Sequence, residues 1–180
     1  MRFVIVGCGR VGAALAEAFD NAGHEVTVLD TSTRAFDRLS EEFKGQAIRG
    51  DGTDEDVLRK AGVEGADVLL AFTEGDNRNV MAAQVAMEKL SVGKTIAKIN
   101  DPVRAAAYAD LGIATVCRTT MLTDAVLTYL DLGKTGMPSV IAPVPHVHEE
   151  GAGPVASPVA TGAGGAAPAQ GHVHAESRRA

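Results

Sequence analysis

Short apolar runs alternate with longer amphipathic segments along the first two thirds of the chain. The first run, residues 3–6, is a continuous β-branched and aromatic stretch, typical of a strand buried on both faces of a parallel sheet. Such runs predict six strands, at residues 3–6, 26–30, 46–49, 68–72, 95–99 and 114–117. Segments with helical spacing begin near residues 11, 33, 54, 77, 102 and 120. This alternation predicts an α/β fold: a Rossmann-like, doubly wound, parallel six-stranded sheet with helices on both faces.

The pattern changes sharply near Met137. From Pro138 onward the chain contains six of its 7 prolines, much glycine and alanine, and neither leucine nor an aromatic residue. Such a segment cannot bury enough apolar surface to offset the entropy lost on ordering it. We therefore predict a folded domain over residues 1–137 and a disordered Pro/Gly/Ala-rich tail over residues 138–180.

The predicted tail carries two His-x-His pairs, His146 with His148 and His172 with His174. Neither pair lies next to a cysteine or within a predicted folded frame, as a built metal site would require. We expect these histidines to be solvated, and we predict no metal site.

Composition limits the class of protein. The chain has 180 residues, of which 46% are hydrophobic and 22% are charged, enough for one good core but not for two large domains. Without an apolar run of 18 residues or a leader before the first strand, we expect a soluble cytosolic protein. The net charge of -6, with scattered Lys and Arg, argues against nucleic acid as a partner.

A glycine-rich turn follows the first predicted strand. Gly7, Gly9 and Gly12 have the G-x-G-x-x-G spacing, which suits a tight turn, a close backbone approach to a pyrophosphate and close packing of the next helix. Asp30 ends the second predicted strand about 20 residues later, where this fold places the carboxylate that binds ribose hydroxyls. Order and spacing together predict a nucleotide-binding site.

Polar residues at the ends of later strands are further candidates. Asp51 and Thr53 follow the third strand, although helix capping alone would explain Thr53. Thr73 ends the fourth strand, where capping does not account for it. Lys98 lies in the last residues of the apolar fifth strand, where a cation needs an anion such as a ligand phosphate or a neighbouring carboxylate.

Four stretches carry a resemblance to a known family, and the long third one is far more specific than the glycine spacing. They read VGCGRVG, VTVLD, GDGTDEDVLRKAGVEGADVLLAFTEGDNRNVMAAQVA and AKINDP. Together they resemble the nucleotide-binding domain of the RCK family, also called KTN or TrkA-N, over about residues 1–130. This resemblance implies a cytoplasmic regulatory subunit that binds NAD(H) or ATP/ADP and gates a membrane potassium channel or Trk/Ktr-type transporter. It also implies a homodimer or a higher ring assembly, held at the inner face of the membrane through its partner.

The resemblance assigns roles to individual positions of this chain. The implied cofactor-binding residues are Gly7, Gly9, Arg10, Val11 and Gly12 around the phosphates, Asp30 at the ribose, Asp51 and Thr53 beside the adenine, Thr73 on the ribose-phosphate side, and Lys98 at the end of strand five. Many relatives continue into a second ligand-binding domain called TrkA-C, whereas this chain continues into the predicted tail. A signal read by that second domain is therefore in doubt for this chain.

An NAD-dependent oxidoreductase of Rossmann type is the alternative function. Hydride transfer needs a substrate pocket and usually an acid or base near the nicotinamide. The predicted folded part has one histidine, His24, placed before the second strand and thus at the edge opposite the ligand crevice. With no second domain to close over a substrate, we predict no catalytic residues and no enzyme activity.

The last predicted helix carries an apolar stripe. Its members repeat at helical spacing and are Met121, Leu122, Ala125, Val126, Tyr129 and Leu130. The stripe is explained either by ordinary core packing or by a partner helix from another subunit, since nothing later in the sequence is suited to cover it. The second explanation supports the expected homodimer.

Overall fold

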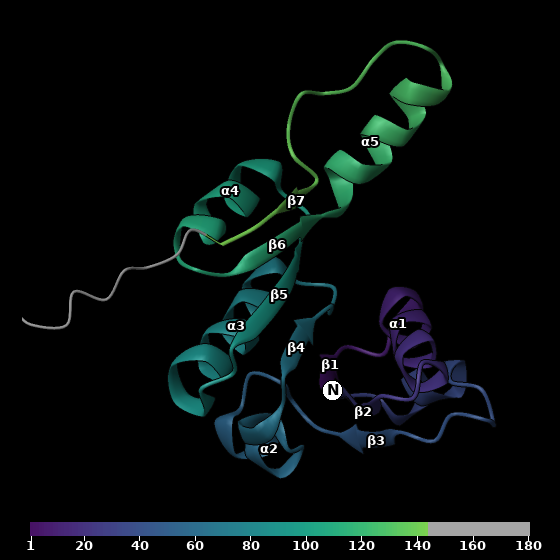
Figure 1. The fold of residues 1–180 in the computed structure, drawn as a ribbon, viewed down its shortest axis with the longest axis vertical. Coiled ribbons are helices and arrows are strands. Elements are labelled where there is room, and N and C mark those ends of the chain that lie inside the picture. The colour runs from purple at the N-terminus through teal and green to yellow at the C-terminus, as the bar shows by residue number, and fades with distance from the viewer. Residues whose placement is uncertain (144–180) are drawn as a thin grey trace, which may run out of the picture. The chain divides into compact units, whose positions relative to one another are not determined.

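The computed structural model describes residues 1–143, in which seven strands form one sheet (Figure 1). The strands are β1 (Arg2–Val6), β2 (Glu25–Asp30), β3 (Gln46–Arg49), β4 (Val68–Ala71), β5 (Lys94–Ile99), β6 (Ala114–Cys117) and β7 (Val140–Ile141). The α-helices are α1 (Arg10–Asn21), α2 (Glu55–Lys60), α3 (Asp76–Leu90), α4 (Pro102–Asp110) and α5 (Arg118–Tyr129), and the 3-10 helices are η1 (Thr33–Arg38) and η2 (Val63–Gly65). The sheet order is β3-β2-β1-β4-β5-β6-β7.

The six predicted strands all form, and they pair in parallel. Their order is that of the dinucleotide-binding fold, in which the chain crosses from one half of the sheet to the other between β1 and β4. The predicted fold class is therefore confirmed.

The seventh strand, β7, differs from the prediction of six strands and lies in the segment predicted as tail. It pairs antiparallel with β6, with Val140 opposite Val116 and Ile141 opposite Thr115. The backbone N–H of Cys117 also donates to the carbonyl of Ser139 at 2.7 Å. Two β-branched residues therefore extend the ordered sheet past Pro138. Residues 144–180, with both His-x-His pairs, lie outside the described residues.

Alternate side chains of the central strands enter separate cores on the two faces of the sheet. On one face, Ile5 and Val28 pack with α1. On the other face, Val4 and Leu69 pack with α2 and α3. Beyond them, Ile99 packs with α3 and α4. The carboxyl ends of β1, β2 and β4 are thereby held rigidly at one edge of the sheet.

Candidate functional site

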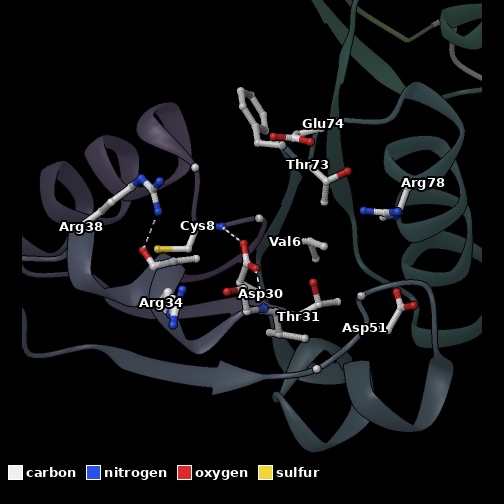
Figure 2. Close-up of a pocket in the computed structure, with 18 residues that line it drawn as sticks. Val6, Cys8, Asp30, Thr31, Arg34, Arg38, Asp51, Thr73, Glu74 and Arg78 are labelled. Carbon is white, nitrogen blue, oxygen red and sulfur yellow. Dashed lines mark hydrogen bonds between the residues drawn. The ribbon is translucent and has the colours of Figure 1, made fainter.

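A cleft with a volume of about 400 Å³ opens at the carboxyl edge of the sheet, where the strand order reverses (Figure 2). Its walls are the glycine turn after β1, the end of β2 with η1, the loop after β3, and the loop after β4 with the first turn of α3. This is the crevice in which open α/β sheets bind their ligands.

The glycine turn begins at Gly7, which only glycine can occupy. Its φ angle is +105°, and a Cβ there would lie 2.9 Å from the carbonyl carbon of Phe72 and from the backbone nitrogen of Thr73. The N–H of Gly7 donates to the carbonyl of Leu29 at 2.7 Å. The turn is thus wedged between the ends of β2 and β4.

The other two glycines of the motif serve different purposes. A Cβ on Gly12 would lie 1.9 Å from the carbonyl oxygen of Gly7, so a larger residue would force α1 away from the turn. A Cβ on Gly9 would meet no protein atom within 4 Å, and its backbone is extended. Gly9 lines the cleft, so its missing side chain leaves space for a ligand rather than for the protein itself.

Asp30 fastens the two loops that form the inner wall of the cleft. Its Oδ2 accepts from the backbone N–H of Cys8 at 2.8 Å, and its Oδ1 accepts from the N–H of Ser32 at 2.9 Å (Figure 2). Each carboxylate oxygen has a further lone pair for a ligand hydroxyl. The sequence predicted the ribose-binding role of Asp30 but not this role in holding the glycine turn.

Cys8 is a neutral part of the turn. Its side chain is fully buried, and burial, followed by the neighbouring Asp30 carboxylate, raises the pKa of the thiol to about 11. The thiol therefore adds no negative charge to the cleft.

The loop after β3 approaches the cleft through a second close contact. A Cβ on Gly52 would lie 2.2 Å from Cγ1 of Val6, so the loop can pack on β1 only with glycine there. Asp51 accepts from both the N–H of Thr53, at 3.0 Å, and its hydroxyl, at 2.8 Å. These hydrogen bonds lower the pKa of the Asp51 carboxyl. Thr53 thus fixes the orientation of the Asp51 carboxylate and does not itself line the cleft.

Thr73 lines the cleft but is also held by Asn79, which is fully buried in α3. The side-chain oxygen of Asn79 accepts from the N–H of Thr73 at 2.8 Å and from its hydroxyl at 2.6 Å. The amide of Asn79 donates to the carbonyl of Lys98 at 2.8 Å. One buried side chain therefore joins the loop after β4 to β5.

Three arginines that the sequence analysis did not single out also line the cleft. Arg34 and Arg38 come from η1, and Arg78 comes from the first turn of α3 (Figure 2). In the described part of the chain, both ion pairs belong to Arg59, which lies away from the cleft lining. Arg34 and Arg38 lie four residues apart in the segment after β2, and this spacing is the sequence signal that could have identified them as lining residues.

Some predicted site residues lie outside the lining of the cleft. They are Arg10, Val11, Gly12, Thr53 and Lys98. Arg10 and Val11 are exposed at the start of α1. Lys98 lies on β5, partly buried, and burial together with Arg118 lowers the pKa of its ammonium group. The cleft is confined to the ends of β1, β2, β3 and β4 and the segments that follow them.

Two further findings concern residues 1–143 alone. They contain no group of three or more His, Cys, Asp or Glu side chains placed to hold a metal ion. None of their helices has the length and apolar character needed to cross a membrane.

The chain matches proteins of a known family. The family model for the TrkA-N domain matches residues 3–119. The Trk system potassium uptake protein TrkA of Streptomyces coelicolor is 45% identical over 130 residues, which cover 72% of this chain and 58% of that protein. The TrkA homolog of Pyrococcus abyssi is 33% identical over 102 residues, which cover 57% of this chain and 45% of that protein. The chain thus spans about half the length of the curated relatives it matches.

Solved structures share the fold. The TrkA-N domain of the inner membrane protein ybaL from Escherichia coli has a TM-score of 0.64 at 23% identity, covering 72% of this chain and 96% of that one. The GsuK channel bound to NAD has a TM-score of 0.59 at 20% identity, and the match covers 70% of this chain and 23% of the channel chain. The sequence match and the shared architecture agree: the chain belongs to the TrkA-N domain family.

Proposed function

We propose that this chain is a cytosolic regulatory subunit of a potassium transport system that binds NAD(H) or ATP/ADP in the cleft and gates a membrane potassium channel or transporter. The relatives named Trk system potassium uptake protein support a role in potassium transport. Two structures with the same fold, the GsuK channel bound to NAD and a Kef domain in its AMP-bound form, support an adenine nucleotide. The observation that carries the proposal is the glycine turn at the cleft, with Asp30 beside it.

The cleft offers a place for each part of an adenine nucleotide. Phosphates would lie over the extended backbone at Gly9, next to the free N–H groups at the start of α1. Arg78 would supply positive charge from the opposite wall. Asp30 would accept from the ribose hydroxyls, and the adenine would lie toward Asp51 and its loop. The three arginines, which share the lining with three acids, offer cationic partners for phosphate groups.

Binding without catalysis fits the side chains in the cleft. Its lining contains no histidine, lysine or tyrosine. His24 lies at the other edge of the sheet, beside the ring of Phe3 at 5.2 Å. The lining contains three acids, of which Asp30 and Asp51 are engaged by hydrogen bonds from the chain itself and Glu74 is the third. We therefore assign no catalytic or metal-binding residue to this cleft.

A chain of contacts connects the cleft with the far end of the domain. In the same first turn of α3 as Arg78, the carboxylate of Asp76 accepts from the backbone N–H of Asn100 at 2.9 Å and from its side-chain amide at 2.7 Å. The carbonyl of Asn100 is 3.8 Å from the Cys117 thiol, which precedes α5. Nucleotide contacts at Arg78 would bias these loops, provided that the ligand binds two arrangements of the domain with different affinity.

Complementation of potassium uptake tests this function. In cells that lack the gene and grow poorly at low potassium, the wild-type chain should restore uptake, and Gly9→Val should not. Gly93→Val is the matched control, because a Cβ at Gly93 also meets nothing within 4 Å but lies away from the cleft. Restored uptake by Gly9→Val would overturn the proposed link between the cleft and transport. Rapid NADH oxidation by the purified chain with a small carbonyl substrate would instead support an oxidoreductase.

A further inference from the structure

Asn79 lies fully buried in α3, behind the wall of the cleft that follows β4, and its hydrogen bonds fix the orientation of its side-chain amide. The backbone N–H of Thr73 can only donate, so the Asn79 atom that it meets at 2.8 Å is the oxygen. The carbonyl oxygens of Thr73 and Lys98 can only accept, so the Asn79 atom that they meet at 3.2 Å and 2.8 Å is the nitrogen. Backbone groups on both sides therefore exclude the flipped amide.

This orientation determines where the hydroxyl hydrogen of Thr73 points. The hydroxyl oxygen lies 2.6 Å from the side-chain oxygen of Asn79, which carries no hydrogen, so the hydroxyl must be the donor. A hydroxyl has one hydrogen and two lone pairs. Thr73 lines the cleft, yet its hydroxyl hydrogen and its backbone N–H both point to Asn79. Toward a ligand, the Thr73 hydroxyl therefore offers lone pairs alone.

Hydrogen-bond donors and acceptors are thus separated along the cleft. Gly9 precedes α1, whose first backbone N–H groups receive no side-chain cap and face an anion favourably. Asp30 and Thr73 lie at the ends of β2 and β4, the strands on either side of β1, and both present acceptors (Figure 2). Glu74, next to Thr73 in the lining, adds a carboxylate. The glycine turn is therefore suited to a diphosphate, and the strand end on each side of it is suited to a sugar hydroxyl.

We infer that Asn79 is a positioning residue that makes Thr73 a hydrogen-bond acceptor for a sugar hydroxyl of the ligand and turns a phosphate away from it. A phosphate oxygen would face the lone pairs of Thr73 and the charge of Glu74, whereas a sugar hydroxyl would supply the hydrogen that Thr73 lacks. A sugar beyond the diphosphate is present in NAD(H) and absent from ADP and ATP. The inference rests on the proposed nucleotide site and favours, within it, a ligand with a second ribose.

Titration of the purified full chain with ADP and with ADP-ribose tests this assignment. The two probes share the adenosine and the diphosphate, and only ADP-ribose has a second sugar. Thr73→Val keeps the branched shape of the side chain and removes the hydroxyl, while the Asn79 oxygen retains a backbone N–H as donor. We expect Thr73→Val to weaken binding of ADP-ribose about threefold to tenfold, as for one neutral hydrogen bond, and to change that of ADP less than about twofold. Thr73→Ser, which keeps the hydroxyl, is the matched control and should bind both probes as the wild type does.

Asn79→Ala tests the positioning residue itself. Without the Asn79 oxygen, the Thr73 hydroxyl could turn its hydrogen to a phosphate, so the preference for ADP-ribose over ADP should fall about threefold or more. A merely structural role of Asn79 would weaken both probes by the same factor and leave this preference unchanged, which would overturn its role in positioning. The Thr73 variants decide the inference where Asn79→Ala does not fold.

The Thr73→Val titrations separate failure of this inference from failure of the proposed function. Equal weakening of ADP and ADP-ribose would overturn the inference, because Thr73 would then contact a part that the two probes share. Unchanged binding of both would overturn it too, because Thr73 would then make no contact with the second sugar. A wild-type chain that binds neither probe would overturn the proposed nucleotide site together with the inference.

Discussion

Asp30 accepts a hydrogen bond from the backbone N–H of Cys8 at 2.8 Å, so the end of β2 fixes the turn that follows β1. The same carboxylate accepts from Ser32. A residue expected to contact only the ligand therefore also holds the loops of the site in place. This relationship changes what a substitution of Asp30 should do.

Asp30→Ala should destabilise the fold even without nucleotide. It leaves two backbone N–H groups without their acceptor, and one belongs to the fully buried Cys8, at a cost of about 1 to 3 kcal/mol. Urea unfolding measures the loss. Asp37→Ala, which removes an exposed acid from η1, is the control. Identical midpoints for wild type and Asp30→Ala would show that the carboxylate does not support the turn.

Substitutions at Gly12 and Gly9 should separate the effect of a glycine on folding from its effect on ligand binding. Gly12→Ala should cost about 2 kcal/mol or more, because its Cβ would lie 1.9 Å from the carbonyl oxygen of Gly7. Gly9→Ala has open space and should leave the melting temperature nearly unchanged. Thermal unfolding of both variants checks this. A destabilised Gly9→Ala would mean that the position serves the fold.

Arg78→Gln should weaken binding of ATP and ADP by about tenfold or more, since charge-assisted hydrogen bonds contribute about 1.5 to 3 kcal/mol. The matched control is Lys89→Gln, which removes an exposed cation at the other end of α3. Calorimetric titration of the wild type and both variants, each at two salt concentrations, gives their dissociation constants for ATP and for ADP. Equal dissociation constants for wild type and Arg78→Gln would remove Arg78 from the binding site.

Asp51 should make a small contribution to stability that depends on pH. Hydrogen bonds from Thr53 lower its folded-state pKa, so the contribution is present above the unfolded value of about 3.9 and is lost as pH falls through the lowered pKa. The difference in unfolding midpoint between wild type and Asp51→Asn should therefore shrink between pH 5 and pH 2.5. A difference that stays constant over this range would contradict the assignment.

The sequence predicted the features that depend on local pattern. β1 and β4 are continuous apolar runs from Phe3 and Val68, and the other main strands are short segments between helical patterns. The glycine spacing predicted tight backbone positions, which the structure shows at Gly7 and Gly12. Features that depend on the arrangement of distant segments were missed. β7 is two residues long and exists through pairing with β6, and Arg78 reaches the cleft through the placement of α3 on the sheet.

Lys98 shows most clearly what the sequence pattern could not predict. The pattern correctly identified a cation in an apolar strand that lacked an obvious partner. It could not indicate which face of the sheet the side chain enters, because that depends on which helices cover β5. The structure places Lys98 partly buried on β5, beyond the lining of the cleft.

Equilibrium titration of the purified full chain with ATP, ADP, NADH and NAD tests the central claim most directly. The account predicts saturable binding of at least one of these adenine nucleotides by the wild type and by Gly93→Val. It predicts no binding by folded Gly9→Val, whose added side chain would occupy the space over the glycine turn. Binding of the same nucleotide by Gly9→Val with unchanged affinity, or no binding by the wild type, would contradict the account.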